Sequence, residues 1–329
     1  MSPRAVMLTH AKEPLVVAPR EVGAPGPGDV RLALECCTLG LSDWNALTLD
    51  APPRLPLVPG QEAVGRVEAV GQGAALHVGQ RVAVTPLATS CGSCEVCLTG
   101  QARWCARAAW HGLQRDGALA THGVFAAQHL VPIDEGDDAA QVACWVGSGW
   151  TALGALRAGG VDRGTRVAVF GVGGVGHLAV QLALHRGAEV SVVDLDVERR
   201  KFGETLGASS VLPPGGVEVA LVCTPSIQAV QQAVRSLRPG GVAVLVGSTP
   251  TGRVDVGLSD VVLRGVTLRG SVVGSAVDLR EVLALGRAGV LLARVDVAPL
   301  EAAAERLWWL RDGGFIGRLV FECATAPAS

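Results

Sequence analysis

A glycine-rich stretch near the middle of the chain constrains the fold more than any other segment. It reads TRVAVFGVGGVGHLAVQLALHRG and passes from an apolar run through Gly171, Gly173 and Gly176, in G-x-G-x-x-G spacing, to an amphipathic run. In such a unit the first glycine makes a tight turn, the second lets a pyrophosphate approach the backbone, and the third lets the helix pack on the strand. Free N–H groups at the helix start attract phosphate. The pattern predicts a dinucleotide-binding strand, turn and helix, with Gly174 among its contacts; an ordinary tight turn is the alternative.

The segment after this helix indicates whether the chain binds NAD(H) or NADP(H). It reads AEVSVVDLD and contains Asp194, about 20 residues after the turn, where a carboxylate binds the ribose 2′-hydroxyl. Because a carboxylate there repels a 2′-phosphate, we expect NAD(H) rather than NADP(H). Arg199 follows and is a second candidate for the same ribose, although a solvated arginine on a helix face needs no function.

Hydrophobic periodicity divides the chain into regions. With 329 residues it is too long for a single core. Residues 1–145 carry short β-type runs punctuated by glycine and proline, which predicts a β domain with few helices. Residues 146–275 alternate apolar strands with amphipathic helices, which predicts a doubly wound parallel sheet of the Rossmann type. Residues 276–329 add helices and a last strand. The expected fold class is α/β with a separate β domain.

Four cysteines lie close together in CGSCEVCLTGQARWC, at Cys91, Cys94, Cys97 and Cys105. Four thiolates at C-x₂-C-x₂-C-x₇-C spacing can close a tetrahedral zinc site. An iron–sulfur cluster is the competing interpretation, since it also takes three closely spaced cysteines and a fourth; the longer last gap favours zinc. Because a closed four-cysteine site has no open coordination position, we expect it to stabilise the lobe over 91–105 rather than to catalyse.

Charge and cysteine content exclude several classes of function. The formal net charge is −2, and lysine and arginine form no cluster, which argues against nucleic acid or an anionic membrane as a partner. The stretch MSPRAVMLTHAKEP lacks the apolar core of a signal peptide, and no segment reads as a membrane span. Nine cysteines without a secretion signal favour thiols and metal over disulfides. We therefore expect a cytoplasmic protein that acts on a small molecule.

The two motifs, in this order and at this separation, resemble the zinc-containing medium-chain dehydrogenase/reductase family of the alcohol dehydrogenase type. The resemblance extends over the whole chain and includes PGQEAVGRVEAVG and the closing GRLVFE. It implies a GroES-like, β-barrel-type catalytic domain, a Rossmann domain, a returning tail, and an active site between the domains. It also implies NAD(H), one structural zinc per chain, and a homodimer or homotetramer joined near TLRGSVVG. By position in the motifs it places Ser148, Val175 and Arg318 near the cofactor, with Val175 behind the nicotinamide and Arg318 at the pyrophosphate.

The resemblance breaks at the catalytic zinc. In this family the ion takes a cysteine three residues before the aspartate of an S/T-D pair, the histidine of G-H-E, and a cysteine ahead of the Rossmann domain. Here the pair is Ser42–Asp43 and the residue three before Asp43 is Gly40, while Gln61 stands at the histidine position. The third ligand is kept as Cys144. Because catalytic zinc needs three protein ligands, we expect no ion beside the nicotinamide.

The missing ligands indicate a different reaction from alcohol oxidation. Zinc makes a hydroxyl proton leave near neutral pH by lowering the pKa of the bound oxygen. Reducing a conjugated C=C bond instead needs hydride at the β-carbon and hydrogen-bond donors for the enolate oxygen. We therefore expect an NADH-dependent reductase of an α,β-unsaturated carbonyl compound, above all a short enoyl thioester (an enoyl-CoA, for example 3-methylcrotonyl-CoA reduced to isovaleryl-CoA). The alternatives are a zinc-dependent alcohol dehydrogenase with an atypical ligand set and a non-catalytic NAD(H)-binding protein.

Three residues are candidates for the reacting centre, each with a plainer alternative. Ser42 can donate to a carbonyl oxygen or relay a proton, or it can cap the helix predicted at SDWNAL. Glu62 can support the site or form a structural ion pair. Cys144 can line the pocket or serve as a small buried apolar side chain. Tryptophans can shape an acyl pocket, although aromatic residues are more often core; the candidates are Trp44, Trp110, Trp145 and Trp150. A histidine can act as an acid or be an ordinary polar residue; the candidates are His111, His122 and His129.

Overall fold

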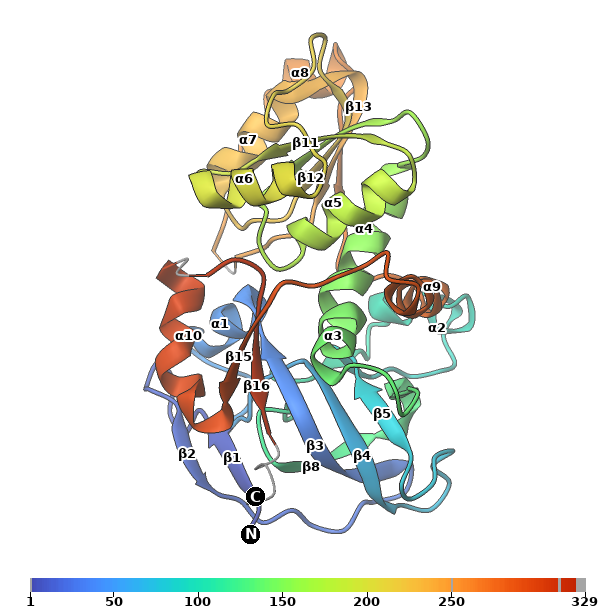
Figure 1. The fold of residues 1–329 in the computed structure, drawn as a ribbon, viewed down its shortest axis with the longest axis vertical. Coiled ribbons are helices and arrows are strands. Elements are labelled where there is room, and N and C mark those ends of the chain that lie inside the picture. The colour runs from blue at the N-terminus through green and yellow to red at the C-terminus, as the bar shows by residue number, and fades with distance from the viewer. Residues whose placement is uncertain (1, 250, 313–314, 324–329) are drawn as a thin grey trace. The chain divides into compact units, whose positions relative to one another are not determined.

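Residues 2–249, 251–312 and 315–323 are described by the computed structural model drawn in Figure 1. Within them the strands form a five-stranded sheet, a seven-stranded sheet and two small two-stranded sheets. None of the helices in these residues combines the length and the hydropathy that a membrane-spanning helix requires. The predicted α/β fold class is confirmed.

The chain divides into two units, and the second is inserted into the first. One unit contains residues 1–147 and 294–329, and the other contains residues 148–293. The chain therefore returns to the first unit at Arg294 and not near residue 276, which corrects the predicted start of the tail.

The later return has a packing cause. Helix α9 (Ala276–Arg287) begins with a capping box at Ser275 and packs on α4 (Trp150–Gly159). The indole N–H of Trp150 donates to the carbonyl oxygen of Ser275 (2.7 Å), and the guanidinium of Arg157 pairs with Asp278 and Glu281. These contacts tie α9 to the second unit.

The second unit is built on the parallel sheet. Its strand order, β11-β10-β12-β13-β14, is that of a doubly wound sheet in which the chain reverses direction beside β10. The strands run over Glu189–Val193 (β11), Arg166–Phe170 (β10), Val217–Val222 (β12), Leu237–Leu245 (β13) and Thr267–Gly270 (β14).

Helices cover both faces of this sheet because successive strand residues point to opposite sides (Figure 1). On one face, Ala168 and Phe170 of β10 join a core with residues of α7. On the other face, β12 packs so closely on α4 that a Cβ at Gly159 would overlap Val219. The remaining helices are α5 (Gly176–His185), α6 (Val197–Thr205), α7 (Ile227–Ser236) and α8 (Leu258–Val262).

The first unit is built on the seven-stranded sheet. Its order is β15-β16-β3-β4-β5-β9, with β8 also paired to β3. The long strand β3 alternates buried and partly exposed side chains along most of its length and is buried at its end, which is typical of a strand that covers a core on one face. The bounds are Asp29–Leu39 (β3), Glu62–Val70 (β4), Arg81–Val84 (β5), His122–Ala126 (β8), Val131–Pro132 (β9), Val295–Pro299 (β15) and Arg318–Glu322 (β16).

Smaller elements complete the first unit. The two-stranded sheets pair β1 (Arg4–Met7) with β2 (Val16–Pro19) and β6 (Leu87–Thr89) with β7 (Ala109–Trp110). The helices are α1 (Leu41–Leu47), α2 (Glu95–Leu98), α3 (Ala139–Cys144) and α10 (Ala303–Asp312).

Candidate active site and metal centre

The four-cysteine lobe brings its sulfur atoms together. The Sγ atoms of Cys91, Cys94, Cys97 and Cys105 all lie within 4.8 Å of one another. Three pairs are separated by 3.5–3.8 Å. A tetrahedral zinc ion with bonds of about 2.3 Å places its sulfurs about 3.8 Å apart. The residues therefore fit a structural zinc ion.

The local backbone is arranged around these sulfurs. The Cys91 Sγ accepts from the Cys94 N–H (3.3 Å), and the Cys105 Sγ accepts from the N–H groups of Arg107 (3.3 Å) and Cys91 (3.5 Å). Such donors stabilise a negatively charged sulfur. The lobe has little core of its own, because α2 contains no buried residue and Leu98 is 74% exposed. A bound metal ion would take over the role that a core plays elsewhere.

The glycine-rich turn of the second unit has the predicted geometry. It joins β10 to α5. Gly171 has φ 92°, a conformation that favours glycine. A Cβ at Gly176 would overlap the carbonyl oxygen of Gly171, whereas a Cβ at Gly173 would meet nothing within 4 Å. Close packing thus explains Gly176, and Gly173 leaves open space beside the helix N-terminus. The strand, turn and helix predicted from the spacing are confirmed.

The Asp194 carboxylate links the glycine-rich turn to the loop that follows β11. Its Oδ2 accepts from the Val172 N–H (2.8 Å) and its Oδ1 from the Asp196 N–H (3.0 Å). Arg199 lies 3.9 Å from the Asp196 carboxylate. Arg200, which the sequence analysis did not select, donates to the carbonyl oxygen of Asp194 (2.6 Å). Its only sequence signal is its place beside Arg199.

Ser148 lies in a short π-helix, Trp145–Gly149, that joins α3 to α4. Its side chain is 1% exposed, and its hydroxyl has no hydrogen-bond partner among the described residues. Buried polar groups are normally paired, and π-helical turns are frequent at functional sites. Ser148 therefore fits a ligand contact, while Gly174 and Val175 are partly exposed within the glycine-rich turn. The cofactor contacts themselves stay predictions.

A buried arginine lies beside Gly40, the position at which the resemblance places a cysteine ligand of the catalytic zinc. Arg318 begins β16, and its buried Nη2 donates to the Thr38 Oγ1 (2.5 Å) and to the Glu62 carboxylate. The Thr38 hydroxyl also donates to Glu62. A Cβ at Gly40 would overlap the Arg318 Nη1. The guanidinium thus lies against the position where the resemblance places a cysteine ligand.

Glu62 therefore takes the plainer of its two predicted roles. It forms a buried ion pair with Arg318, whose guanidinium charge the carboxylate already balances. Burial alone would lower the pKa of Arg318, but the Glu62 carboxylate, assisted by nearby thiols and Asp43, raises it above its ordinary value. The expectation that Arg318 contacts a pyrophosphate stays a prediction.

Asp43 and Cys144 are buried beside this ion pair. The Asp43 carboxylate accepts from the N–H groups of Gly40 (2.9 Å) and Gly60 (3.1 Å). Burial and the nearby Glu62 raise the pKa of Asp43 from 3.8 to about 7. Burial also raises the pKa of Cys144 to about 12. Without a bound ion, the Cys144 thiol is therefore protonated at neutral pH.

Ser42 is not the helix cap that its alternative interpretation required. Gly40 is the N-cap of α1, and the Asp43 side chain completes the cap by accepting from the Gly40 N–H. Ser42 lies in the first turn of α1 and is exposed. Its hydroxyl is therefore accessible to a ligand.

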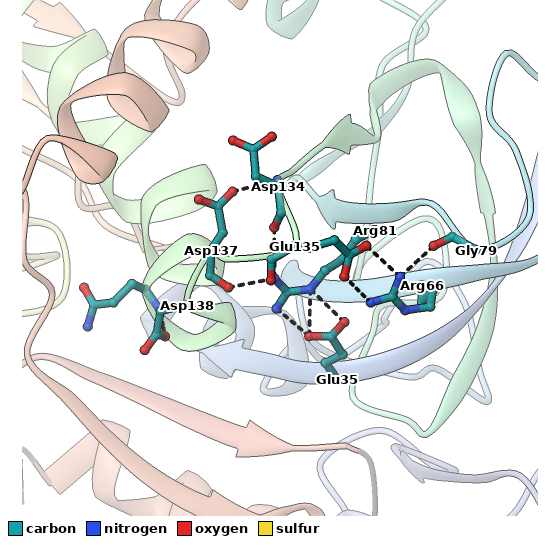
Figure 2. Close-up of polar contacts among 9 residues, drawn as sticks. Glu35, Arg66, Gly79, Arg81, Asp134, Glu135, Asp137 and Asp138 are labelled. Carbon is teal, nitrogen blue, oxygen red and sulfur yellow. Dashed lines mark hydrogen bonds and ion pairs between the residues drawn. The ribbon is translucent and has the colours of Figure 1, made fainter.

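The helix that carries Cys144 is anchored by an arginine that the sequence analysis missed (Figure 2). The buried Arg81 donates through Nε (2.9 Å) and Nη2 (2.6 Å) to the Glu35 carboxylate. Its Nη1 donates to three carbonyl oxygens of the loop at 134–138, and Asp138 in that loop caps α3 with its side chain. The three carbonyl groups are those of Asp134 (3.1 Å), Glu135 (3.1 Å) and Asp137 (2.7 Å).

The candidate histidines have structural contacts. His111 is buried and bonds the Thr85 carbonyl oxygen (2.8 Å), and burial lowers its pKa to about 4. His122 faces Glu68 (3.5 Å), and His129 bonds the Ser90 hydroxyl (3.0 Å). None of these histidines belongs to a metal-binding group: in the described part of the chain, the four-cysteine lobe alone gathers three or more such ligands.

The candidate tryptophans are placed differently from one another. Trp145 and Trp150 are buried, and Trp110 is partly exposed at the small sheet beside the lobe. Trp44 lines a pocket of about 160 Å³ together with Leu15, Leu47 and Leu307. The last of these lies on α10, so the pocket brings together distant parts of the first unit.

Known proteins resemble the chain over its full length. Residues 26–135 match the family described as alcohol dehydrogenase GroES-like domain, and residues 174–287 match that described as zinc-binding dehydrogenase. An alcohol dehydrogenase of Geobacillus stearothermophilus is 35% identical, over 97% of this chain and 99% of the relative. An alcohol dehydrogenase of Moraxella sp. (strain TAE123) is 33% identical, also over 97% and 99%.

Solved structures show the same likeness. An alcohol dehydrogenase of the archaeon Aeropyrum pernix superimposes with a TM-score of 0.89 at 27% identity, over 97% of this chain and 99% of that one. Acetophenone reductase of Geotrichum candidum, solved in complex with NAD, gives a TM-score of 0.88 at 25% identity, over 98% and 97%.

Proposed function

Because the chain belongs to the zinc-containing branch of the medium-chain dehydrogenase/reductase family and is an NAD(H)-dependent oxidoreductase, we propose that it reduces an activated C=C bond without a metal ion at the reacting centre. The observation that carries this proposal is the buried guanidinium of Arg318, which lies against Gly40 and pairs with Glu62. Gly40 and Gln61 cannot supply the thiolate and imidazole that the family uses, so Cys144 is the one ligand of the three that the sequence keeps.

The substrate class follows from what the remaining side chains can do. NADH, when bound, would supply a hydride to the β-carbon, and the α-carbon of the resulting enolate would take a proton from water. Without a Lewis acid, removal of an alcohol proton at neutral pH is slow, whereas an enolate oxygen needs only donors, each worth about 3 kcal/mol when well placed. Ser42 is exposed on α1 and offers such a donor. We favour a short enoyl thioester, since its carbonyl group activates the β-carbon and gives the donor an oxygen to bind.

The residues proposed to hold NAD(H) are those of the second unit. The turn at Gly171, Gly173, Gly174 and Gly176 would receive the pyrophosphate at the N-terminus of α5. Asp194 would bind the ribose hydroxyls through the carboxylate lone pairs that Val172 and Asp196 leave free. The buried hydroxyl of Ser148 would find its missing partner on the cofactor. One zinc ion per chain would bind in the four-cysteine lobe.

A zinc-dependent alcohol dehydrogenase with an atypical ligand set is the second candidate. Several relatives favour it, since four with more than 30% identity are named alcohol dehydrogenase. It would require a metal site built from other residues than the three of the family. A non-catalytic NAD(H)-binding protein is the third candidate.

One experiment separates the three. NADH consumption is measured with a panel of enoyl-CoAs, ketones and aldehydes, and NAD⁺ reduction with alcohols, while the zinc content of the same sample is determined. The proposal expects turnover of an enoyl thioester with one zinc per chain. Alcohol oxidation with two zinc ions per chain would favour the dehydrogenase instead. NADH binding with no turnover of any substrate would favour the non-catalytic protein.

A second copy of the chain is the partner that we propose. Strand β14 ends the order of the parallel sheet, so its outer edge offers unpaired backbone groups to another β14. Light scattering of the full chain tests this proposal, since it expects a dimer or tetramer. A monomer at micromolar concentration would contradict it.

A further inference from the structure

We infer that the Arg318 guanidinium is the built-in cation of the buried cluster formed with Thr38, Gly40, Glu62 and Cys144 (the Arg318 pocket), and that it keeps a second metal ion out. The inference rests on the proposed function, in which this pocket holds no metal. It adds a reason why no second ion binds: the guanidinium fills the space and already supplies the positive charge, so the missing ligands are only part of the explanation.

The first argument concerns space. The Arg318 Nη1 lies so close to Gly40 that a Cβ at that position would overlap it. A side chain at position 40, including a metal-binding one, therefore has to shift the guanidinium, which is the end of a flexible side chain held beside Gly40 by Glu62 and Thr38. The absence of a side chain at Gly40 and the presence of the guanidinium are two aspects of one arrangement.

The second argument concerns charge. The Glu62 carboxylate is buried and packs so tightly on the backbone of Gly147 that a Cβ there would overlap it. Glu62 is thus held with its charge in the pocket. A buried carboxylate needs a cation or strong donors beside it, and Arg318 with Thr38 supplies both. A divalent ion would add two positive charges beside a guanidinium that already balances Glu62.

The third argument concerns the hydrogen bond that the Arg318 guanidinium lacks in this position. Its Nε is buried and has no hydrogen-bond partner among the described residues. An unpaired buried donor costs free energy, so the guanidinium is held by its charge on Glu62 and not by a complete set of hydrogen bonds.

Restoring the family's ligands should therefore not be enough to restore a metal site. The variant Gly40→Cys/Gln61→His, together with the natural Cys144, supplies three ligands. With Arg318 intact we expect it to bind one metal ion per chain, as the natural protein does. The triple variant Gly40→Cys/Gln61→His/Arg318→Gln removes the competing cation, and we expect it to bind two.

The probe is Co²⁺, added to the full-length chain after its zinc has been exchanged. Tetrahedral cobalt with thiolate ligands absorbs visible light, so stoichiometry and ligand type are read from the same titration. The matched control is Gly40→Cys/Gln61→His/Arg306→Gln, which removes an arginine paired with Asp296 in the same unit. It should stay at one ion per chain.

The outcomes separate this inference from the function on which it rests. Uptake of a second ion by the double variant with Arg318 intact, at an affinity within threefold of the triple variant, would overturn the inference alone. A second ion in the natural chain would overturn both. If the triple variant does not fold, unfolding of Arg318→Gln is compared with that of Arg318→Gln/Glu62→Gln. The inference then expects the single variant to be the less stable, and the reverse order would overturn it.

Discussion

The first unit contains two regions where the family resemblance places a metal ion, and they differ in what holds them together. In the four-cysteine lobe all four ligands are present, on a loop and short helices with no buried residue in α2. In the pocket around Arg318 a single ligand, Cys144, is left, and the surrounding residues are buried at the ends of β3, β4 and β16.

The two regions differ in how much of their stability packing can supply without a metal ion. The lobe cannot replace its metal by packing, because its apolar side chains, such as Leu98, are exposed. The pocket lies in a unit with an extensive core that includes Leu39, Val84 and Phe321. There we propose that a guanidinium takes the place of the ion, since the sheet already fixes the residues around it.

The largest effect is expected from removing the lobe's metal. Zinc contributes on the order of 10 kcal/mol to folding in small zinc peptides, and this lobe has no core to offset its loss. We expect Cys97→Ser to lose its zinc, lower the temperature of unfolding and expose residues 91–105 to protease. Zinc content, calorimetry and limited proteolysis measure this. Cys223→Ser, which changes a partly exposed cysteine in the second unit, is the control that should keep its zinc. Retention of zinc by Cys97→Ser would remove the contrast between the two regions.

A smaller but still large effect is expected from breaking the ion pair in the pocket. Arg318→Gln leaves the buried Glu62 carboxylate without its cation, and such a loss costs about 3–5 kcal/mol. Adding Glu62→Gln should recover a large part of that loss, because the uncompensated charge is gone. Urea unfolding of the natural chain, the two single variants and the double variant gives the coupling free energy between Arg318 and Glu62. Additive effects would show that the pair does not hold the pocket together.

The pH dependence of stability is expected to depend on Asp43. Its pKa is raised from 3.8 to about 7 by burial and by Glu62, so between these values the folded state holds a proton that the unfolded state has lost. This contribution is fully present below about pH 4 and is lost as the pH rises through about 7. The slope is at most about 1.4 kcal/mol per pH unit.

The prediction for Asp43 therefore concerns how steeply the free energy of unfolding changes with pH. Asp43→Asn cannot ionise, and we expect its stability to fall less steeply than that of the natural chain between pH 5 and 7. Because the amide also disturbs the bonds from Gly40 and Gly60, absolute stabilities are not compared. Parallel profiles from urea unfolding would contradict a protonated Asp43.

Local spacing explains why one region was predictable from the sequence and the other was not. The four cysteines and the glycines of the turn lie within short segments, so their side chains or backbone meet whatever the remaining chain does. Gly40 and Gln61 also revealed the missing ligands. The occupant of the pocket was not predictable, because Arg318 reaches Thr38 from 280 positions along the chain.

Other differences between the sequence-based predictions and the structure also arise from contacts that the sequence pattern does not reveal. The return of the chain at Arg294 depends on how α9 packs on α4, which helical periodicity does not reveal. Ser42 and Gly40 both precede a predicted helix, and sequence preference favours serine as the cap. Gly40 takes that place because the Asp43 side chain can bond its N–H. Arg81 was missed because its partners are mostly backbone carbonyl groups, which no residue type marks.

The smallest effect is expected at a third arginine, which tests whether burial or ion pairing distinguishes the Arg318 pocket. Arg66 forms a two-pronged pair with Glu135 (2.8 and 2.7 Å), but the two side chains are 43% and 71% exposed (Figure 2). Water and salt screen such pairs, so Arg66→Gln should shift the urea midpoint only slightly, and less at high salt. Arg318→Gln is the matched variant, with the same substitution in a buried pair. If both variants lose equal stability, burial is not what makes the Arg318 pocket depend on its cation.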